Sequence, residues 1–182
     1  MFLREEWFQE YKVEVNVMKI GIVYYSRTGN TRGVAKILEE KLKEKHAEVD
    51  LIEIEHVKRP GFFAAGRASM NQLELPIKNT NFNMEKYDVI LAGCPTWAGR
   101  PSPFMKIFIN KAENIKGKKI AIFGTGMSPL NAREQFKEII RNNLEKAGMK
   151  TFDNFLALQF KRGKLVDGEQ NIDNFVNTVL KL

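Results

Sequence analysis

The chain has 182 residues, of which 43% are hydrophobic, and a formal net charge of +7. This length suits one domain with a sizeable core, and the hydrophobic content excludes a disordered chain. No apolar run is long enough to cross a bilayer, and the N-terminus lacks the apolar centre of a secretory signal. The single cysteine, Cys94, excludes an internal disulfide, so we expect a cytoplasmic protein.

Residues 1–17 precede the first predicted strand and contain both acids and aromatic residues. They are either a short amphipathic cap or an upstream extension that the fold does not need. We therefore predict one domain over residues 18–182 and assign no function to the extension.

Residues 19–36 are the most informative stretch of the chain. Residues 20–25 form an apolar run typical of a buried strand, and helical spacing follows at Val34, Ile37, Leu38 and Leu42. The turn between them, residues 26–31, reads Ser-Arg-Thr-Gly-Asn-Thr. Free backbone amides and the helix dipole favour an anion at such a turn, and Gly29 lets the backbone close around it. The turn predicts a phosphate site, and the alternative is an ordinary capped turn.

Residues 48–55 alternate between apolar and acidic side chains, which predicts a strand near a sheet edge. Residues 56–84 are expected to be an irregular excursion, too long for an ordinary connection. Because Phe62 and Phe63 make the excursion too apolar for disorder, we expect them to pack against the body, a ligand or another subunit. The first of these, a packed excursion within the domain, is the preferred interpretation.

The remaining chain alternates strands and helices. Apolar strands are predicted at 87–93, 120–124 and 155–160, and helices at 104–108, 136–144 and 172–179. We expect a loop at residues 95–102 after the first of these strands and another at 124–128 after the second. His46 and His56 show no metal-ligand spacing and are expected to be solvated, and no metal site is predicted.

Alternating strands and helices predict an α/β fold with a doubly wound, five-stranded parallel sheet and helices on both faces. Ligands of such sheets bind beyond the carboxyl ends of the strands. The turn at 26–31 and the loops at 95–102 and 124–128 should therefore face one site. Trp97 could stack there on a flat ring or be a half-buried core aromatic, whereas Cys94 is interpreted as a small residue at a strand end.

The segments Tyr25–Thr31 and Cys94–Pro103 resemble the cofactor loops of flavodoxins and flavodoxin-like proteins. The resemblance implies FMN as the cofactor and the strand order 2-1-3-4-5. It implies phosphate ligands at Ser26, Thr28, Gly29, Asn30 and Thr31, with charge compensation from Arg27. It also implies contacts with the flavin ring at Pro95, Thr96, Trp97, Ala98 and Gly99, and close approach at Gly124, Thr125, Gly126 and Met127. Flavodoxins often carry a second aromatic where this chain has Met127, so one ring face is expected to be more open.

The resemblance predicts an electron-transfer flavoprotein that shuttles electrons between redox partners, and no catalytic side chain is assigned. The alternative is an NAD(P)H-dependent flavin or quinone reductase, and a third reading is a fold that has lost its flavin. The positive charge favours acidic partners and departs from the acidic character of electron-carrier flavodoxins. The lysines are scattered, so no specific nucleic-acid partner is expected, and a homo-oligomer could form through residues 56–84.

Overall fold

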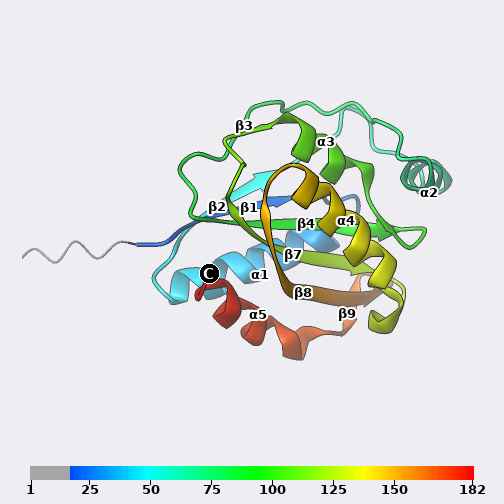
Figure 1. Ribbon diagram of the computed structural model, residues 1–182. Coiled ribbons are helices and arrows are strands. Elements are labelled where there is room, and N and C mark those ends of the chain that lie inside the picture. The colour runs from blue at the N-terminus through cyan, green and yellow to red at the C-terminus, as the bar shows by residue number, and fades with distance from the viewer. Residues whose placement is uncertain (1–16) are drawn as a thin grey trace, which may run out of the picture.

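The computed structural model describes residues 17–182, and its centre is a mostly parallel sheet between two layers of helices (Figure 1). The five parallel strands are β1 (Lys19–Tyr24), β2 (Glu48–Glu53), β4 (Val89–Trp97), β7 (Lys119–Gly126) and β8 (Lys150–Lys161). They lie in the order β2-β1-β4-β7-β8, which confirms the predicted order and the predicted fold class. The predicted extension lies, apart from Val17, outside the described residues.

Two short antiparallel strands enlarge this sheet beyond the five that the sequence predicts. β5 (Arg100–Pro101) pairs with β4, and β9 (Lys164–Asp167) pairs with the far edge at β8. Neither has the apolar pattern of a buried strand, since β9 is mostly exposed and β5 has two residues. Both strands were therefore missed.

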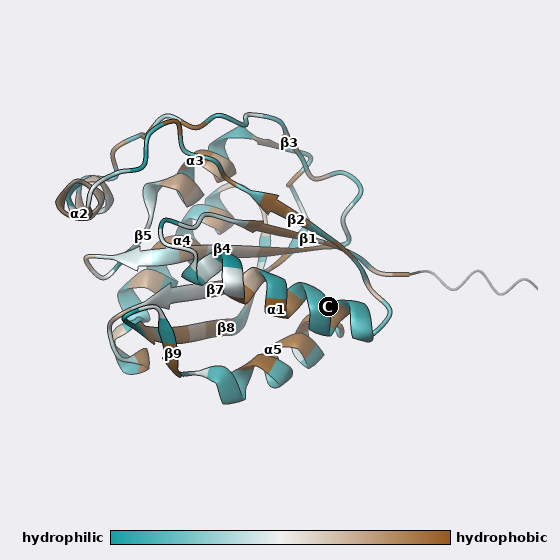
Figure 2. Ribbon diagram, turned by 180° about the vertical axis from the view of Figure 1, so that it is seen from behind, coloured by the Kyte–Doolittle hydropathy of each residue, from teal (hydrophilic) through white to brown (hydrophobic). Residues whose placement is uncertain are grey.

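The central strands are apolar throughout because both of their faces are covered. Alternate residues of β1 point to opposite sides: Ile20 and Ile22 join one core cluster, and Val23 joins the other. The first cluster contains buried residues of α1 (Asn30–Glu44) and α5 (Ile172–Val179). The second contains buried residues of α3 (Pro103–Lys111) and α4 (Glu134–Lys146). Figure 2 shows the resulting division, with apolar strands inside and polar outer faces on the helices.

The predicted edge strand is confirmed, and the predicted helices are present, although α3 and α4 extend beyond the predicted 104–108 and 136–144. β2 pairs with β1 on one side, and its Glu48 and Asp50 are exposed. α4 ends just before Gly148, which has a φ of 80° and suits the left-handed position after a helix. Single turns of 3-10 helix precede α4 at Leu130–Ala132 and α5 at Glu169–Asn171.

Residues 56–84 are not irregular throughout, contrary to expectation. They include α2 (Phe62–Met70) and β3 (Phe82–Asn83), which pairs with β6 (Ala112–Glu113). The side of α2 that faces the body consists of the small residues Ala65, Ala68 and Ser69.

The expected packing of the two phenylalanines against the body is wrong. Phe62 is 63% exposed and Phe63 is 89% exposed, because both lie on the first turn of α2, away from its small buried face. α2 itself projects at one end of the molecule, beside the β4–β5 hairpin (Figures 1 and 2). Among residues 17–182, no helix has the length and apolarity needed to cross a bilayer.

Candidate functional site

The strand register brings the three predicted loops together at the carboxyl edge of the sheet. Tyr24 of β1 lies opposite Gly93 of β4, and Pro95 of β4 lies opposite Thr125 of β7. The carboxyl ends of β1, β4 and β7 therefore lie next to one another at this edge of the sheet. The hydroxyls of Thr31 and Thr125 form a buried hydrogen bond of 2.8 Å, which ties the first loop to the third.

The turn at residues 26–31 has the backbone of an anion-binding helix end. Gly29 has a φ of 97° and a ψ of −20°, a left-handed conformation that strains any residue with a Cβ. Its amide donates to Ser26 Oγ at 3.1 Å, which closes the turn. The first amides of any α-helix lack intrahelical acceptors. Because α1 has no side-chain cap and no acid in its first turn, these amides also lack a side-chain acceptor there and face no competing carboxylate.

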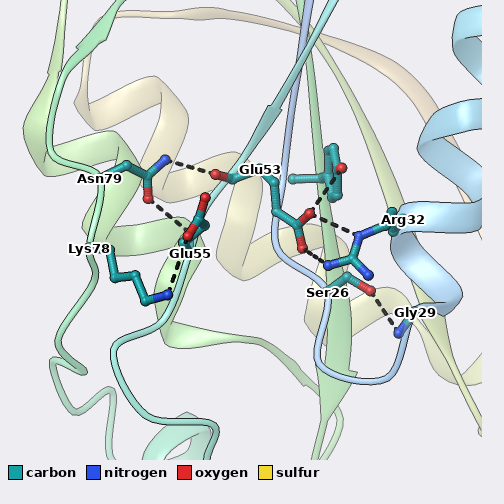
Figure 3. Close-up of polar contacts among 8 residues, drawn as sticks. Ser26, Gly29, Arg32, Glu53, Glu55, Lys78 and Asn79 are labelled. Atoms are coloured by element: carbon teal, nitrogen blue, oxygen red, sulfur yellow. Dashed lines mark hydrogen bonds and ion pairs between the residues drawn. The ribbon is translucent and has the colours of Figure 1, made fainter.

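The charges beside this turn are already partly committed to protein contacts (Figure 3). Arg32 makes two hydrogen bonds to the carboxylate of Glu53, at 2.9 and 2.6 Å. Tyr24 also donates to that carboxylate, at 3.2 Å, and burial together with the Glu53 charge raises the pKa of Tyr24 to about 12. Arg27 donates from Nε to Pro60 O at 2.9 Å, which ties the turn to the segment before α2.

The chain after α2 is anchored at the same end of the sheet. Asn79 donates to Glu53 O at 2.7 Å and accepts from the Glu55 amide at 2.8 Å, as Figure 3 shows. Lys78 lies 3.5 Å from Glu55, an exposed ion pair that contributes little stability by itself. These contacts lie at the end of β2, which Arg32 joins to the start of α1 through Glu53.

The predicted loop at residues 95–102 is a β-hairpin instead of an irregular loop. Pro95 and Trp97 belong to β4, and Thr96 pairs with Pro101 of β5. The two turn residues, Ala98 and Gly99, have φ values of 48° and 77°, as a two-residue turn with both residues left-handed requires. The sequence did not predict this hairpin because two prolines, Pro95 and Pro101, are poor signals for a strand and an alanine is a poor signal for such a turn.

Trp97 is half-buried at the tip of this hairpin, where it pairs with Arg100 next to the turn. Its ring meets the rings of Tyr25 and Phe104 edge-on, with centroid distances of 5.6 and 6.2 Å. Tyr25 and Phe104 are stacked on each other at 3.9 Å. The aromatic cluster fixes one edge of the indole and leaves part of the side chain exposed, so core packing and ligand contact are compatible at this position.

The predicted third loop at residues 124–128 is a loop only after Gly126, because β7 runs through Gly124, Thr125 and Gly126. The roles of its residues also differ. A Cβ on Gly124 would lie 3.0 Å from the Phe136 ring, so core packing alone explains this glycine. A Cβ on Gly126 would lie 3.0 Å from Thr96 Cβ, which shows how closely the third loop approaches the hairpin. Met127, which stands where flavodoxins often carry an aromatic residue, is 66% exposed.

Two minor predictions are also tested by the structure. Cys94 is fully buried, but it lies inside β4 and not at the strand end where it was expected, because β4 continues to Trp97; burial raises the pKa of its thiol to about 12. His46 is exposed as expected. His56 is instead half-buried, with its ring centroid 5.8 Å from that of Tyr25.

Two residues at the site had no signal in the sequence. Arg133, which directly precedes α4, is 1% exposed and donates to Thr96 Oγ1 at 3.0 Å. Gln159 of β8 donates to Met127 O at 2.8 Å and holds the third loop from the other side. An isolated arginine before a helix and a glutamine in a strand are ordinary surface residues in a sequence, and only the fold shows that they are buried.

This combination of sheet, uncapped helix end and aromatic hairpin defines the class of flavodoxin-like flavoproteins. Residues 18–161 match the family model described as NADPH-dependent FMN reductase, and the chain belongs to this family of FMN-binding proteins. FMN, the cofactor expected from the sequence, is thus the cofactor of the family.

Known relatives and structures agree with the class. A flavodoxin from Maridesulfovibrio salexigens is 28% identical over 161 residues, which cover 86% of this chain and 90% of that protein. A flavodoxin from Clostridium saccharobutylicum is 28% identical over 142 residues, 77% of this chain and 76% of that one.

Two solved structures share the fold at low sequence identity. A putative flavoprotein from Bacteroides eggerthii has a TM-score of 0.67 and 19% identity, covering 89% of this chain and 98% of that chain. A flavoprotein from Lactobacillus acidophilus in complex with FMN has a TM-score of 0.59 and 18% identity, covering 87% of this chain and 99% of that chain.

Proposed function

We propose that this chain binds FMN across the carboxyl edge of its sheet and transfers electrons between redox partners. The observation that carries the proposal is the uncapped, acid-free start of α1, held by the Thr31–Thr125 bond beside the Trp97 hairpin. FMN, when bound, supplies the redox chemistry, and the protein controls its orientation, surroundings and access.

The turn at residues 26–31 would hold the phosphate. Its free first-turn amides and the dipole of α1 suit a dianion. Ser26, Thr28, Asn30 and Thr31 add polar side chains, although Ser26 and Thr31 already have protein partners. Because Arg32 is committed to Glu53, we assign charge compensation to the turn itself and to Arg27.

The hairpin and the third loop would hold the ring. Trp97 offers a flat surface whose edge is fixed by Tyr25 and Phe104, so little side-chain entropy is lost when a ring packs on it. Pro95, Thr96, Ala98 and Gly99 would form the rest of this wall, and Thr125, Gly126 and Met127 the neighbouring one. Gly124 would contribute indirectly, because its lack of a side chain leaves room for the Phe136 ring in the core.

Purification of the full chain tests the cofactor assignment. We expect a yellow protein with flavin absorbance bands, and apoprotein that binds FMN more tightly than riboflavin, which lacks the phosphate. A protein that binds neither, or binds both equally, would contradict the placement of the phosphate at residues 26–31.

A second candidate function is an NAD(P)H-dependent flavin or quinone reductase. Two observations favour it: the family match and the exposed Met127 at the position that would otherwise cover a ring face. An open face admits a nicotinamide, and the net charge of +7 attracts the polyanionic NADPH.

Steady-state oxidation of NADPH or NADH by the FMN-loaded protein separates the two functions. An electron carrier shows no turnover without a separate reductase, whereas a reductase turns over with a quinone or free flavin alone. For the carrier, we propose acidic partner proteins and a cytoplasmic location. A homo-oligomer through residues 56–84 also stays a proposal, which the mass of the protein in solution tests.

A further inference from the structure

Arg133 is a buried cation without a counter-ion. Its side chain is among the largest that are fully buried, with 1% exposure. Within residues 17–182 it forms no ion pair, and Nε has no hydrogen-bond acceptor. Removing a guanidinium from water without an anion is costly, so a buried unpaired arginine requires an explanation.

The hydrogen bonds of Arg133 go to neutral groups on β4, on β8 and on the loop after β7. Nη1 donates to Thr96 Oγ1 at 3.0 Å, and Nη2 donates to Ser128 O at 3.1 Å and to Leu158 O at 3.2 Å. These neutral acceptors orient the fork but leave its charge uncompensated. Burial accordingly lowers the pKa of Arg133, and an arginine still keeps its proton under ordinary conditions.

The position of the guanidinium is next to the proposed ring site. It contacts Thr96 directly, and a Cβ on Gly126 would lie 3.2 Å from Nη2. Thr96 and Gly126 are two of the residues that we assign to the walls around the flavin ring. The positive charge therefore lies immediately behind these walls and is separated from solvent, where screening is weak.

We propose that Arg133 is a positioning residue that raises the reduction potential of the flavin, by holding its uncompensated charge behind Thr96 and Gly126. The inference rests on the proposed FMN site. Two electrons from a redox partner and one proton from water would convert the neutral oxidised ring into a reduced ring with one net negative charge. A fixed cation nearby stabilises the negative product more than the neutral reactant, so reduction becomes more favourable.

The competing explanation is that Arg133 only fastens the third loop to β4 and β8. Both explanations predict weaker FMN binding when the side chain is changed. They differ in the reduction potential that they predict for two kinds of variant: one that keeps the positive charge, and one that removes a neutral hydrogen bond to the third loop. Arg133→Gln removes the charge and keeps amide donors, whereas Arg133→Lys keeps the charge and loses the fork. Gln159→Met removes the neutral bond to Met127 O and changes no charge.

The test is the midpoint potential of the FMN-loaded full chain, measured by dithionite titration against a reference dye. We expect Arg133→Gln to lower the equilibrium constant for two-electron reduction about tenfold or more, which is about 30 mV. Arg133→Lys and Gln159→Met should keep the potential near that of the wild type, even if they bind FMN more weakly. The affinity for sulfite, which forms a negatively charged adduct with oxidised flavin, should fall with the potential in Arg133→Gln alone.

Several results would overturn the inference. An unchanged potential in Arg133→Gln would do so, as would an equal fall in Gln159→Met. If Arg133→Gln does not bind FMN, Arg133→Lys decides, because this variant keeps the charge. A lowered potential in Arg133→Lys would contradict the inference, and an unchanged potential would support it. Wild-type protein that binds no FMN would refute the proposed function and this inference together; a bound flavin indifferent to Arg133 refutes the inference alone.

Discussion

The hydroxyls of Thr31 and Thr125 lie 2.8 Å apart in the interior, although 94 positions separate them in the chain. Thr31 belongs to the first turn of α1 and is 1% exposed; Thr125 belongs to β7 and is 2% exposed. The bond joins the helix end that we assign to the phosphate with the loop that we assign to the ring. It therefore sets the distance between two halves of the proposed site.

Removing this bond should affect stability and cofactor affinity together. Thr31→Val leaves the Thr125 hydroxyl buried without a partner, which should cost about 1–3 kcal/mol of unfolding free energy. The double variant Thr31→Val/Thr125→Val removes both hydroxyls and should be less destabilised than the sum of the single variants. Urea unfolding of the apoprotein measures the coupling, and additive effects would show that the bond contributes nothing.

Gly29 offers an isosteric test of charge at the phosphate turn. Gly29→Asn and Gly29→Asp introduce side chains of nearly equal size, and both Asn and Asp tolerate the left-handed conformation better than other residues. The aspartate adds a negative charge beside the bound dianion, so its FMN dissociation constant should exceed that of the asparagine variant by about tenfold, or about 1.4 kcal/mol. Fluorescence titration with FMN measures both constants, and riboflavin is the control, since it should not distinguish the two variants. Equal FMN affinities would place the phosphate elsewhere.

Trp97 should report directly on flavin binding. The chain has two tryptophans, Trp7 and Trp97. If the ring lies on Trp97, FMN should quench a large part of the tryptophan fluorescence of the wild type and much less of that of Trp97→Phe. Trp97→Phe keeps an aromatic against Tyr25 and Phe104, so the fold should survive. Quenching that survives the substitution in full would contradict the ring placement.

The buried thiol of Cys94 predicts a pH dependence. Its folded pKa of about 12 lies above the ordinary thiol value, so the unfolded chain loses this proton first as the pH rises. The folded state is therefore most stable, as far as this thiol is concerned, below the pKa of the thiol in the unfolded chain. Between the pKa values of the unfolded and the folded chain, the free energy of unfolding falls by up to about 1.4 kcal/mol per pH unit.

Two measurements check this prediction. Iodoacetamide at pH 8 should not label the folded protein and should label Cys94 in denaturant. Unfolding in urea at pH 8 and pH 10 should show a stability loss that shrinks in Cys94→Ala. Rapid labelling of the folded protein would show that the thiol is accessible and ionised.

The sequence predicted the parallel sheet because strands buried on both faces are continuous apolar runs, as in residues 87–93. It also predicted the turn before α1, since the residue types at 26–31 serve local backbone geometry around Gly29. Both features depend on residues close together in the chain, so they can be predicted without the tertiary contacts. A phosphate at this turn stays a prediction.

The errors involve features that depend on distant partners. The hairpin at Ala98 and Gly99 is stabilised in part by Ser69 of α2, which donates to Pro101 O at 2.8 Å. Arg133 resembles a surface arginine until β4 and β8 enclose it. The burial expected for Phe62 and Phe63 failed because apolar character does not determine which side of a short helix faces the body.

The most direct test of the account compares amide chemical shifts of the apoprotein with FMN and with riboflavin added. We predict that FMN shifts the amides of residues 28–31 together with the Trp97 indole, and that riboflavin shifts the indole without the turn. Shifts that leave the turn unchanged with FMN, or that lie on another face of the molecule, would contradict the proposed site.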